Sequence, residues 1–245
     1  MNRPGAQLTV SNLHAFYGES HVLHGVDLEV YPGELVTLLG RNGSGRSSTL
    51  RPIMNMVGHR TWSIVINGRE TLTIAAHKIA RLGVGFCPEE RGIFASLSVE
   101  ENLMLPPTVA SGGLSVDEIY SMFPNLKERR KSQGTRLSGG EQQMLALARI
   151  LRTGARLLLL DEITEGLAPV IVERLGEVLA QLKGRGMTIV LVEQNFRFAA
   201  PLADRHYLIE HGQVVDQFNA AELDGKREHL NAMLGKPPVI VSPYD

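Results

Sequence analysis

The stretch 40-GRNGSGRSST-49 has the residue types of a loop that binds phosphate. Gly40, Gly43 and Gly45 allow positive φ angles, so backbone N–H groups can turn inward around an anion. The stretch fits the pattern G-x-x-x-x-G-K-[ST] at every fixed position but one, because Arg46 stands where the pattern has Lys. It therefore predicts a phosphate site with an unusual cation.

Two carboxylates, Asp161 and Glu162, follow a run of four leucines. In a parallel sheet, the carboxyl end of a strand lies at the crevice where ligands bind. Asp161 could hold Mg²⁺ through water, and Glu162 could polarise a water that attacks phosphate. Together with the loop, in which Ser47 would place its hydroxyl on the metal, the pair predicts a site for a nucleotide and Mg²⁺.

A second anion-binding segment is 137-LSGGEQQ-143. Ser138 and Glu141 have the spacing of a capping box, which predicts the start of a helix. Gly139 and Gly140 leave bare N–H groups at that helix N-terminus, where the helix dipole favours an anion. One chain thus carries two predicted anion sites.

Three apolar runs, at 35–39, 156–162 and 187–193, are typical of buried parallel strands. The first leads into the phosphate loop, and a helix over 46–57 is expected directly after that loop. A second helix, beginning at Pro169, lies between the other two strands. Alternating strands and helices predict an α/β fold of the P-loop NTPase type with a mostly parallel sheet.

Other segments add smaller units to this sheet. Short runs between residues 8 and 39 predict an N-terminal antiparallel β subdomain, and 95–150 has helical patterns without a convincing strand, which predicts an inserted helical subdomain. A hairpin is expected around 211–212 and a closing helix over 219–234. Pro52 lies beyond the first turn of its helix, so a kink or local adjustment is expected there.

Composition argues against several classes of protein. The 25 Lys and Arg residues against 26 Asp and Glu give a net charge of −1, so no overall basic field attracts nucleic acid. Cys87 is the only cysteine, which excludes an internal disulfide and suits a reducing compartment. No apolar run approaches the ~18 residues of a membrane span, and the first eight residues lack the apolar stretch of a signal peptide. Any role at a membrane is expected at its cytoplasmic surface.

The loop, LSGGEQQ and LLLLDE together resemble the ATP-binding subunit of an ABC transporter. The resemblance implies a nucleotide-binding domain over 7–237, with the helical subdomain at about 95–150, and a C-terminal tail at 238–245. In that family two subunits sandwich ATP head to tail, and the LSGG helix of one faces the phosphate loop of the other. This arrangement would explain two anion sites on one chain.

The resemblance also implies a role for each residue of the site. The residues expected to hold the nucleotide are Tyr17, Gly40, Arg41, Asn42, Gly43, Ser44, Gly45, Arg46, Ser47 and Ser48. Those expected to face the partner's nucleotide are Ser138, Gly139, Gly140 and Glu141. Mg²⁺ would be served by Ser47, Asp161 and Glu89, and catalysis by Glu162 as general base with Gln194 bonded to the γ-phosphate. Tyr17 would stack on the adenine, although ordinary strand packing of Tyr17 stays open.

Three phrases narrow the resemblance to ATPases of branched-chain amino-acid importers: 88-PEERGIFASLSVEENL-103, 161-DEITEGLAP-169 and 191-LVEQN-195. Related subunits for urea or other amide substrates share them. The resemblance implies ATP and Mg²⁺ as cofactors and membrane permease subunits as partners. It further implies a homodimer or a heterodimer with a second ATPase subunit, an indirect link to a solute-binding protein, no nucleic acid, and a place on the cytoplasmic face of the inner (plasma) membrane.

Arg46 is the main departure from the family pattern. It keeps the charge of Lys but is a broad planar fork, so weaker ATP binding and slow hydrolysis are expected. Asn55, Trp62 and Pro52 also stand where the family more often has small or helix-compatible residues, and Ile163 replaces a usual Pro.

Two further interpretations stay open. The first is a hydrolysis-impaired nucleotide-binding subunit that pairs with a competent partner chain; Arg46 and Gln194 favour it, whereas Glu162 and an intact LSGGEQQ argue against it. The second is a soluble ABC-type ATPase that acts on DNA or ribosomes. Near-neutral charge and the lack of a long coiled-coil insertion argue against that one.

Overall fold

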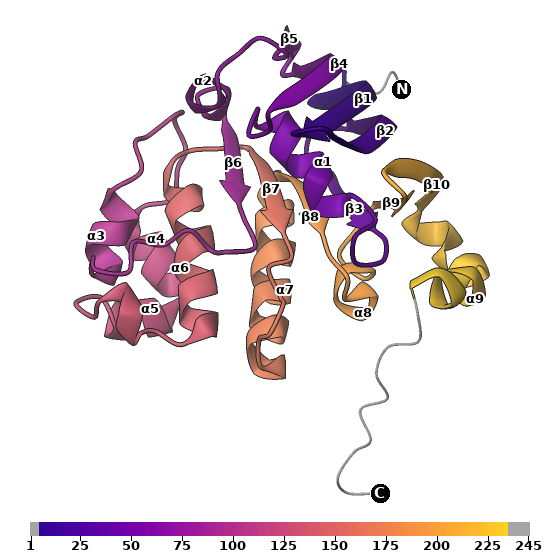
Figure 1. Cartoon of the computed structure of the whole chain (residues 1–245). Coiled ribbons are helices and arrows are strands. Elements are labelled where there is room, and N and C mark those ends of the chain that lie inside the picture. Colours follow the sequence, from indigo (N-terminus) through magenta and orange to yellow (C-terminus); the bar gives the residue numbers. More distant parts are fainter. Residues whose placement is uncertain (1–4, 235–245) are drawn as a thin grey trace, which may run out of the picture.

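The computed structural model describes residues 5–234, apart from the side chains of 227–229 and 231–232, and contains two sheets (Figure 1). The first is antiparallel in the order β2-β1-β4-β5, which confirms the predicted N-terminal unit. Its strands are β1 Leu8–Tyr17, β2 Ser20–Val30, β4 His59–Ile66 and β5 Arg69–Glu70. The tail predicted at 238–245 lies outside the described residues.

The second sheet has the order β10-β9-β3-β8-β7-β6, and its neighbours pair in parallel except β9 with β10. Its strands are β3 Leu35–Leu39, β6 Val84–Cys87, β7 Leu157–Asp161, β8 Thr188–Val192, β9 Arg205–Glu210 and β10 Gln213–Asn219. The three predicted apolar strands are β3, β7 and β8, side by side at its centre. The predicted hairpin is β9 and β10. The α/β prediction with a mostly parallel sheet is confirmed.

The central strands are apolar throughout because both of their faces are buried. In β7, Leu157 and Leu159 belong to a core shared with the antiparallel sheet and α1, whereas Leu158 and Leu160 belong to a core shared with α6 and α7. Successive side chains of a strand point to opposite faces, so a strand between two cores needs an unbroken apolar run. This packing fixes where β7 ends, and its last residue, Asp161, reaches the site.

Helices cover both faces of the parallel sheet (Figure 1). They are α1 Arg46–Ile53, α2 Ala76–Ala80, α3 Val99–Met104, α4 Val116–Met122, α5 Pro124–Glu128, α6 Gly139–Arg152, α7 Pro169–Gly184, α8 Phe196–Ala199 and α9 Leu223–Leu234. Residues 95–150, all of them described, contain helices and no strand, and α3 to α6 gather at one side of the molecule (Figure 1). None of the described helices offers an apolar stretch of the length that a membrane span requires.

The helix predicted over 46–57 is too long, because α1 ends at Ile53. Pro52 supplies no N–H, and the chain leaves the helix with Met56 N donating to Arg51 O and Asn55 N donating to Pro52 O, both at 2.9 Å. These two bonds form a Schellman-type C-cap, which needs a left-handed residue, and Asn55 has φ 53°. The adjustment expected at the proline is therefore the end of the helix, and the strand β4, which was not predicted, follows it.

Candidate functional site

The loop between β3 and α1 leaves polar groups without partners. α1 begins at Arg46, and its N-cap Gly45 has φ 103° and makes no side-chain cap bond. Gly43 has φ 78°, a left-handed conformation that favours glycine. Ser44 Oγ is buried without a hydrogen-bond partner. A phosphate oxygen at this helix N-terminus would satisfy such groups.

Arg46 is buried and paired with Glu162. Its Nη2 donates to Glu162 Oε1 at 2.8 Å and to Asn42 Oδ1 at 3.0 Å, and only 3% of its side chain is exposed. Burial lowers the pKa of Arg46 and raises that of Glu162, and in each case the partner's charge only opposes the change. For both side chains, burial disfavours the charged form by more than the ion pair favours it. The loop cation and the predicted general base are bound to each other, while Arg46 Nη1 stays buried without a partner.

Asp161 has the features of a metal ligand. It is fully buried, and neither of its carboxylate oxygens has a partner of hydrogen-bond geometry. Burial raises the pKa of Asp161, and the nearby Ser47 hydroxyl and Arg51 guanidinium lower it by less. Mg²⁺ takes hard oxygen ligands and keeps several waters. Unpartnered carboxylate oxygens beside a hydroxyl therefore fit Mg²⁺, with Ser47 and Asp161 as the residues that could hold it.

Three carboxylates gather above the loop. Glu89, Glu162 and Glu165 each place one oxygen within 4.8 Å of the others. Burial raises the pKa of Glu89, and the charges of Glu165 and Asp161 raise it further. Glu165 was not predicted as a site residue, although it lies only four positions after Asp161 in the turn that follows β7. The cluster adds negative charge around the buried Arg46.

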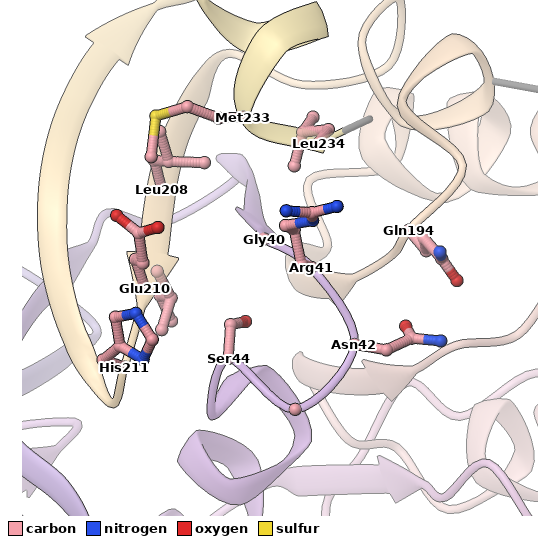
Figure 2. A pocket seen from close by; sticks show the side chains of 12 residues that line it. Gly40, Arg41, Asn42, Ser44, Gln194, Leu208, Glu210, His211, Met233 and Leu234 are labelled. Carbon is pink, nitrogen blue, oxygen red and sulfur yellow. The ribbon is translucent and has the colours of Figure 1, made fainter. Parts of the chain in front are cut away.

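Two cavities meet at the phosphate loop and share Asn42 and Gly43. The smaller, of about 260 Å³, is lined by Asn42, Gly43, Gly45, Arg46, Ser47, Ser48, Glu89, Glu162 and Glu165. The larger, of about 570 Å³, is lined on its loop side by Gly40, Arg41, Asn42, Gly43 and Ser44. Figure 2 shows Gln194 and Asn42 on one side of the larger cavity and Glu210 and His211 on the other. The structure thus brings the predicted loop residues together with Glu89, Glu162 and Gln194.

Tyr17 lies beside the start of α1. Its side chain is 36% exposed at the end of β1. Burial raises its pKa, while the charge of Arg51 and a hydrogen bond with Ser48 lower it. A partly exposed ring next to Ser48 is in a suitable position to stack on a base whose phosphates occupy the loop.

The segment 138–141 lies apart from both cavities, since none of its residues lines either one. It begins α6 with the predicted capping box, in which Ser138 N donates to Glu141 Oε2 at 2.7 Å and Glu141 N donates to Ser138 Oγ at 3.2 Å. Ser138 is exposed. A ligand at this helix N-terminus would have to come from outside the chain's own loop.

Behind the site, Glu193 is a buried carboxylate that sequence reasoning also missed. Thr164 donates to it twice, through N to Oε1 at 3.1 Å and through Oγ1 to Oε2 at 2.9 Å. Burial raises the pKa of Glu193 to about 7, although these bonds lower it in part. The residue joins the turn that contains Glu165 to the strand end that precedes Gln194.

Known proteins resemble this chain over most of its length. The family model described as ABC transporter matches residues 23–165. The high-affinity branched-chain amino acid transport ATP-binding protein BraG of Pseudomonas aeruginosa is 38% identical over 237 residues, which cover 93% of this chain and 99% of that protein. The probable branched-chain amino acid transport ATP-binding protein LivF of Archaeoglobus fulgidus is 35% identical and covers 88% of this chain and 93% of its own.

A relative from another system and a solved structure extend the comparison. The lipopolysaccharide export system ATP-binding protein LptB of Haemophilus influenzae is 31% identical over 85% of this chain and 88% of its own. A structure titled as the ATP binding subunit of an ABC transporter superposes with a TM-score of 0.77 at 26% identity, covering 94% of this chain and all of that one. Names from amino-acid transport and from an export system thus both occur among the relatives.

Proposed function

This chain belongs to the ABC transporter family of ATP-binding proteins, and from that premise we propose that it is the energy-coupling ATPase of an importer for branched-chain or related amino acids. The observation that carries the proposal is one cavity in which the phosphate loop, Arg46 and Glu162 meet, next to the unpartnered carboxylate of Asp161. Its similarity to BraG and LivF supports the substrate class. The proposed location of the chain is the cytoplasmic face of the inner membrane.

In the proposed reaction, backbone N–H groups of the loop bind the outer phosphates of ATP. Arg46 turns its unpartnered Nη1 to the γ-phosphate and releases Glu162. The freed Glu162 accepts a proton from the water that attacks the γ-phosphorus, the bond from that phosphorus to its bridging oxygen breaks, and ADP and phosphate leave. Gln194 hydrogen-bonds the γ-phosphate, and as an amide it takes no part in proton transfer.

Ser47, Asp161 and Glu89 are the proposed residues for Mg²⁺, which when bound neutralises charge on the transferring phosphoryl group. Asp161 has both oxygens available and a desolvated charge that a cation would compensate. Omitting Mg²⁺ should therefore abolish hydrolysis by the purified chain. Undiminished turnover in EDTA would contradict this assignment.

The segment 138–141 would complete the nucleotide site of a second subunit. The exposed Ser138 and the partly exposed Gly139, at the N-terminus of α6, suit a γ-phosphate presented by a partner, whereas Gly140 is buried. A dimer should therefore form with ATP and the slow-hydrolysing Glu162→Gln chain, and Ser138→Arg should prevent it. Size-exclusion chromatography with light scattering measures both; a Ser138→Arg chain that dimerises equally well would argue against the head-to-tail arrangement.

Exposed apolar side chains on the helical side of the molecule suit a permease. Phe94, Met104 and Leu105 are 47%, 53% and 50% exposed, and Phe94 follows the loop of Glu89 by five positions. Exposed large apolar residues that gather in one region commonly mark a contact surface. Glu89 would then connect that surface to the nucleotide.

The test of the whole proposal uses the cell that encodes the chain. Deleting its gene should reduce uptake of radiolabelled leucine, and pull-down of the chain from membranes should recover permease subunits. Normal uptake together with recovery of lipopolysaccharide-export subunits would overturn the importer assignment while leaving the ATPase intact. Glu162→Gln should fail to restore uptake.

The ion pair between Arg46 and Glu162 favours a second candidate, a subunit that binds ATP but hydrolyses it poorly and depends on a sister ATPase. Here the pair persists after ATP binds, so Glu162 does not become a base. The purified chain alone would then show no turnover above its Glu162→Gln variant. Adding the sister subunit would give turnover that is insensitive to Glu162→Gln in this chain.

A further inference from the structure

Four of the chain's eight histidines, His14, His21, His24 and His59, lie on the antiparallel sheet, and none of them lines either cavity. Leu13 and Ala15 of β1 point into the core, so His14 and Phe16 between and after them point outward. In the strand register, His14 lies opposite His24, and Phe16 lies opposite both His21 and His59. Side chains directly opposite in neighbouring strands share a face and touch.

The rings of this cluster are held close together. His14 Nδ1 and His21 Nε2 lie 2.9 Å apart and form a hydrogen bond. Phe16 stacks on His21 with ring centroids 4.3 Å apart and an interplanar angle of 12°, and His24 meets His21 edge-on at 4.0 Å. Aromatic neighbours on both sides restrict the His21 ring, and the hydrogen bond to His14 keeps the two nitrogens close together.

We propose that His14 and His21, with His24 beside them, form a binding site for a divalent transition-metal ion that prefers imidazole, such as Zn²⁺, Ni²⁺ or Cu²⁺. Two nitrogens that each lie ~2.0–2.1 Å from one ion, in neighbouring positions of an octahedral or square-planar geometry, are about 3 Å apart. An ion can therefore replace the hydrogen that this pair shares, after small rotations of the two rings. Water completes the coordination, because His21 is exposed.

Such an ion would link β1 to β2 across the hairpin in which Tyr17 is the last residue of β1. The hairpin is otherwise joined by strand pairing that shifts register at three places between Val10 and Phe16. A metal bridge at His14 and His21 would therefore stabilise the strand end from which Tyr17 reaches the nucleotide site. The metal site itself is independent of the proposed transport function.

Trp62 makes the site directly measurable. It is the only tryptophan in the chain, it is 56% exposed, and its ring centroid lies 5.2 Å from that of His14. Ni²⁺ is paramagnetic and quenches indole fluorescence at such short range, whereas Zn²⁺ does not. Titrating Ni²⁺ into the full chain without a histidine tag should quench Trp62 saturably, and adding Zn²⁺ should restore the emission.

Variants assign the effect to the cluster. His21→Gln changes an exposed side chain and should raise the Ni²⁺ midpoint by more than about tenfold, the least that loss of even an outer-shell partner usually costs. His14→Gln should raise the Ni²⁺ midpoint by a similar factor, and His24→Gln should raise it by a smaller factor. His77→Gln, an exposed histidine of α2, is the matched control and should leave the midpoint unchanged. Unsaturable quenching of the natural chain, or an unchanged midpoint in His21→Gln, would overturn the proposal.

Discussion

The positions that are expected to depart from the family pattern lie in two regions, and their surroundings in the structure differ. Arg46 is 3% exposed at the centre of the nucleotide site, where it contacts the predicted base Glu162. Asn55 and Trp62 lie outside both cavities, after α1 and in β4, and both have positive φ, at 53° and 76°. Arg46 changes which charged groups are in contact at the site, whereas Asn55 and Trp62 affect only the conformation of the backbone.

The two residues of the second region differ in how well they tolerate a left-handed backbone. Asn is the side chain that best tolerates the left-handed conformation, and Asn55 Nδ2 also donates to Ile74 O at 2.9 Å. Trp62 is bulky, and it lies at a bulge where the β1–β4 register shifts between Ser11 and His14. We therefore expect effects on catalysis at Arg46 and Glu162, and effects on stability alone at Asn55 and Trp62.

The strongest test of this division is Glu162→Gln. Removing the proposed base should lower the rate of ATP hydrolysis by about 10²–10⁴-fold, the usual contribution of a general base. Affinity for ATP should persist, because the loop and Asp161 are intact. Steady-state phosphate release and binding of a fluorescent ATP analogue measure the two effects. Equal hydrolysis by both chains would show that Glu162 is not the base.

Arg46→Lys tests the cation of the same site. A slim ammonium should fit the phosphates better than the guanidinium and should release Glu162 more readily, so turnover should rise, by up to about 10²-fold if misplacement of about 1 Å is corrected. Phosphate release by the two chains, at saturating ATP and Mg²⁺, checks this. Arg46→Gln, which lacks the charge, is the control and should be slower than both. Indistinguishable rates for Arg and Lys would remove Arg46 as a source of impairment.

The fold was predictable where one pattern determines one element. The runs at 35–39, 156–162 and 187–193 contain the fully buried strands β3, β7 and β8, and an unbroken apolar run identifies such central strands in the sequence. The strand β4 was missed because its sequence does not show the usual alternation of apolar and polar residues: Arg60 is buried, and Trp62 is exposed at the bulge opposite β1. A pattern within residues 59–66 carries no information about the partner strand β1.

The sequence indicates which residues would form the candidate site, but not which of their side chains would touch. Arg46 and Glu162 are separated by 116 positions, and no spacing rule predicts that their side chains meet at 2.8 Å. Glu193 was missed for a related reason, since its importance arises from burial and from bonds to Thr164, which lies 29 positions away. Motifs indicate which groups enter a site, whereas packing decides which charges neutralise each other.

Glu193→Gln extends the test to pH. The folded-state pKa of Glu193, about 7, lies above the ordinary value of 4.5, so the folded protein binds the proton more tightly than the unfolded chain. The stability this contributes is present below pH 4.5 and is lost as pH rises through 7. From pH 5 to pH 7 the natural chain should lose roughly 2 kcal/mol relative to Glu193→Gln. Urea unfolding at both pH values measures the difference, and parallel pH profiles would contradict the assignment.

The smallest expected effects are on the free energy of unfolding of variants at Trp62 and Asn55, and the two effects should have opposite signs. Trp62→Gly relieves a left-handed backbone that costs an ordinary residue about 1–2 kcal/mol, while glycine returns about 0.5–1 kcal/mol of chain entropy to the unfolded state. The free energy of unfolding should therefore rise by about 0.5–1 kcal/mol. Asn55 tolerates its left-handed conformation, and Asn55→Gly removes its hydrogen bond to Ile74 O. The free energy of unfolding of this variant should therefore fall by about 1 kcal/mol.

Urea denaturation followed by circular dichroism measures both variants, since Trp62→Gly removes the only tryptophan. ATP turnover should stay unchanged in each folded variant, because neither residue lines a cavity of the site. A large change in turnover from Trp62→Gly would mean that strain in β4 reaches the loop through the Schellman turn after α1. The two regions would then be one, and Arg46 could no longer be interpreted separately from the residues that follow its helix.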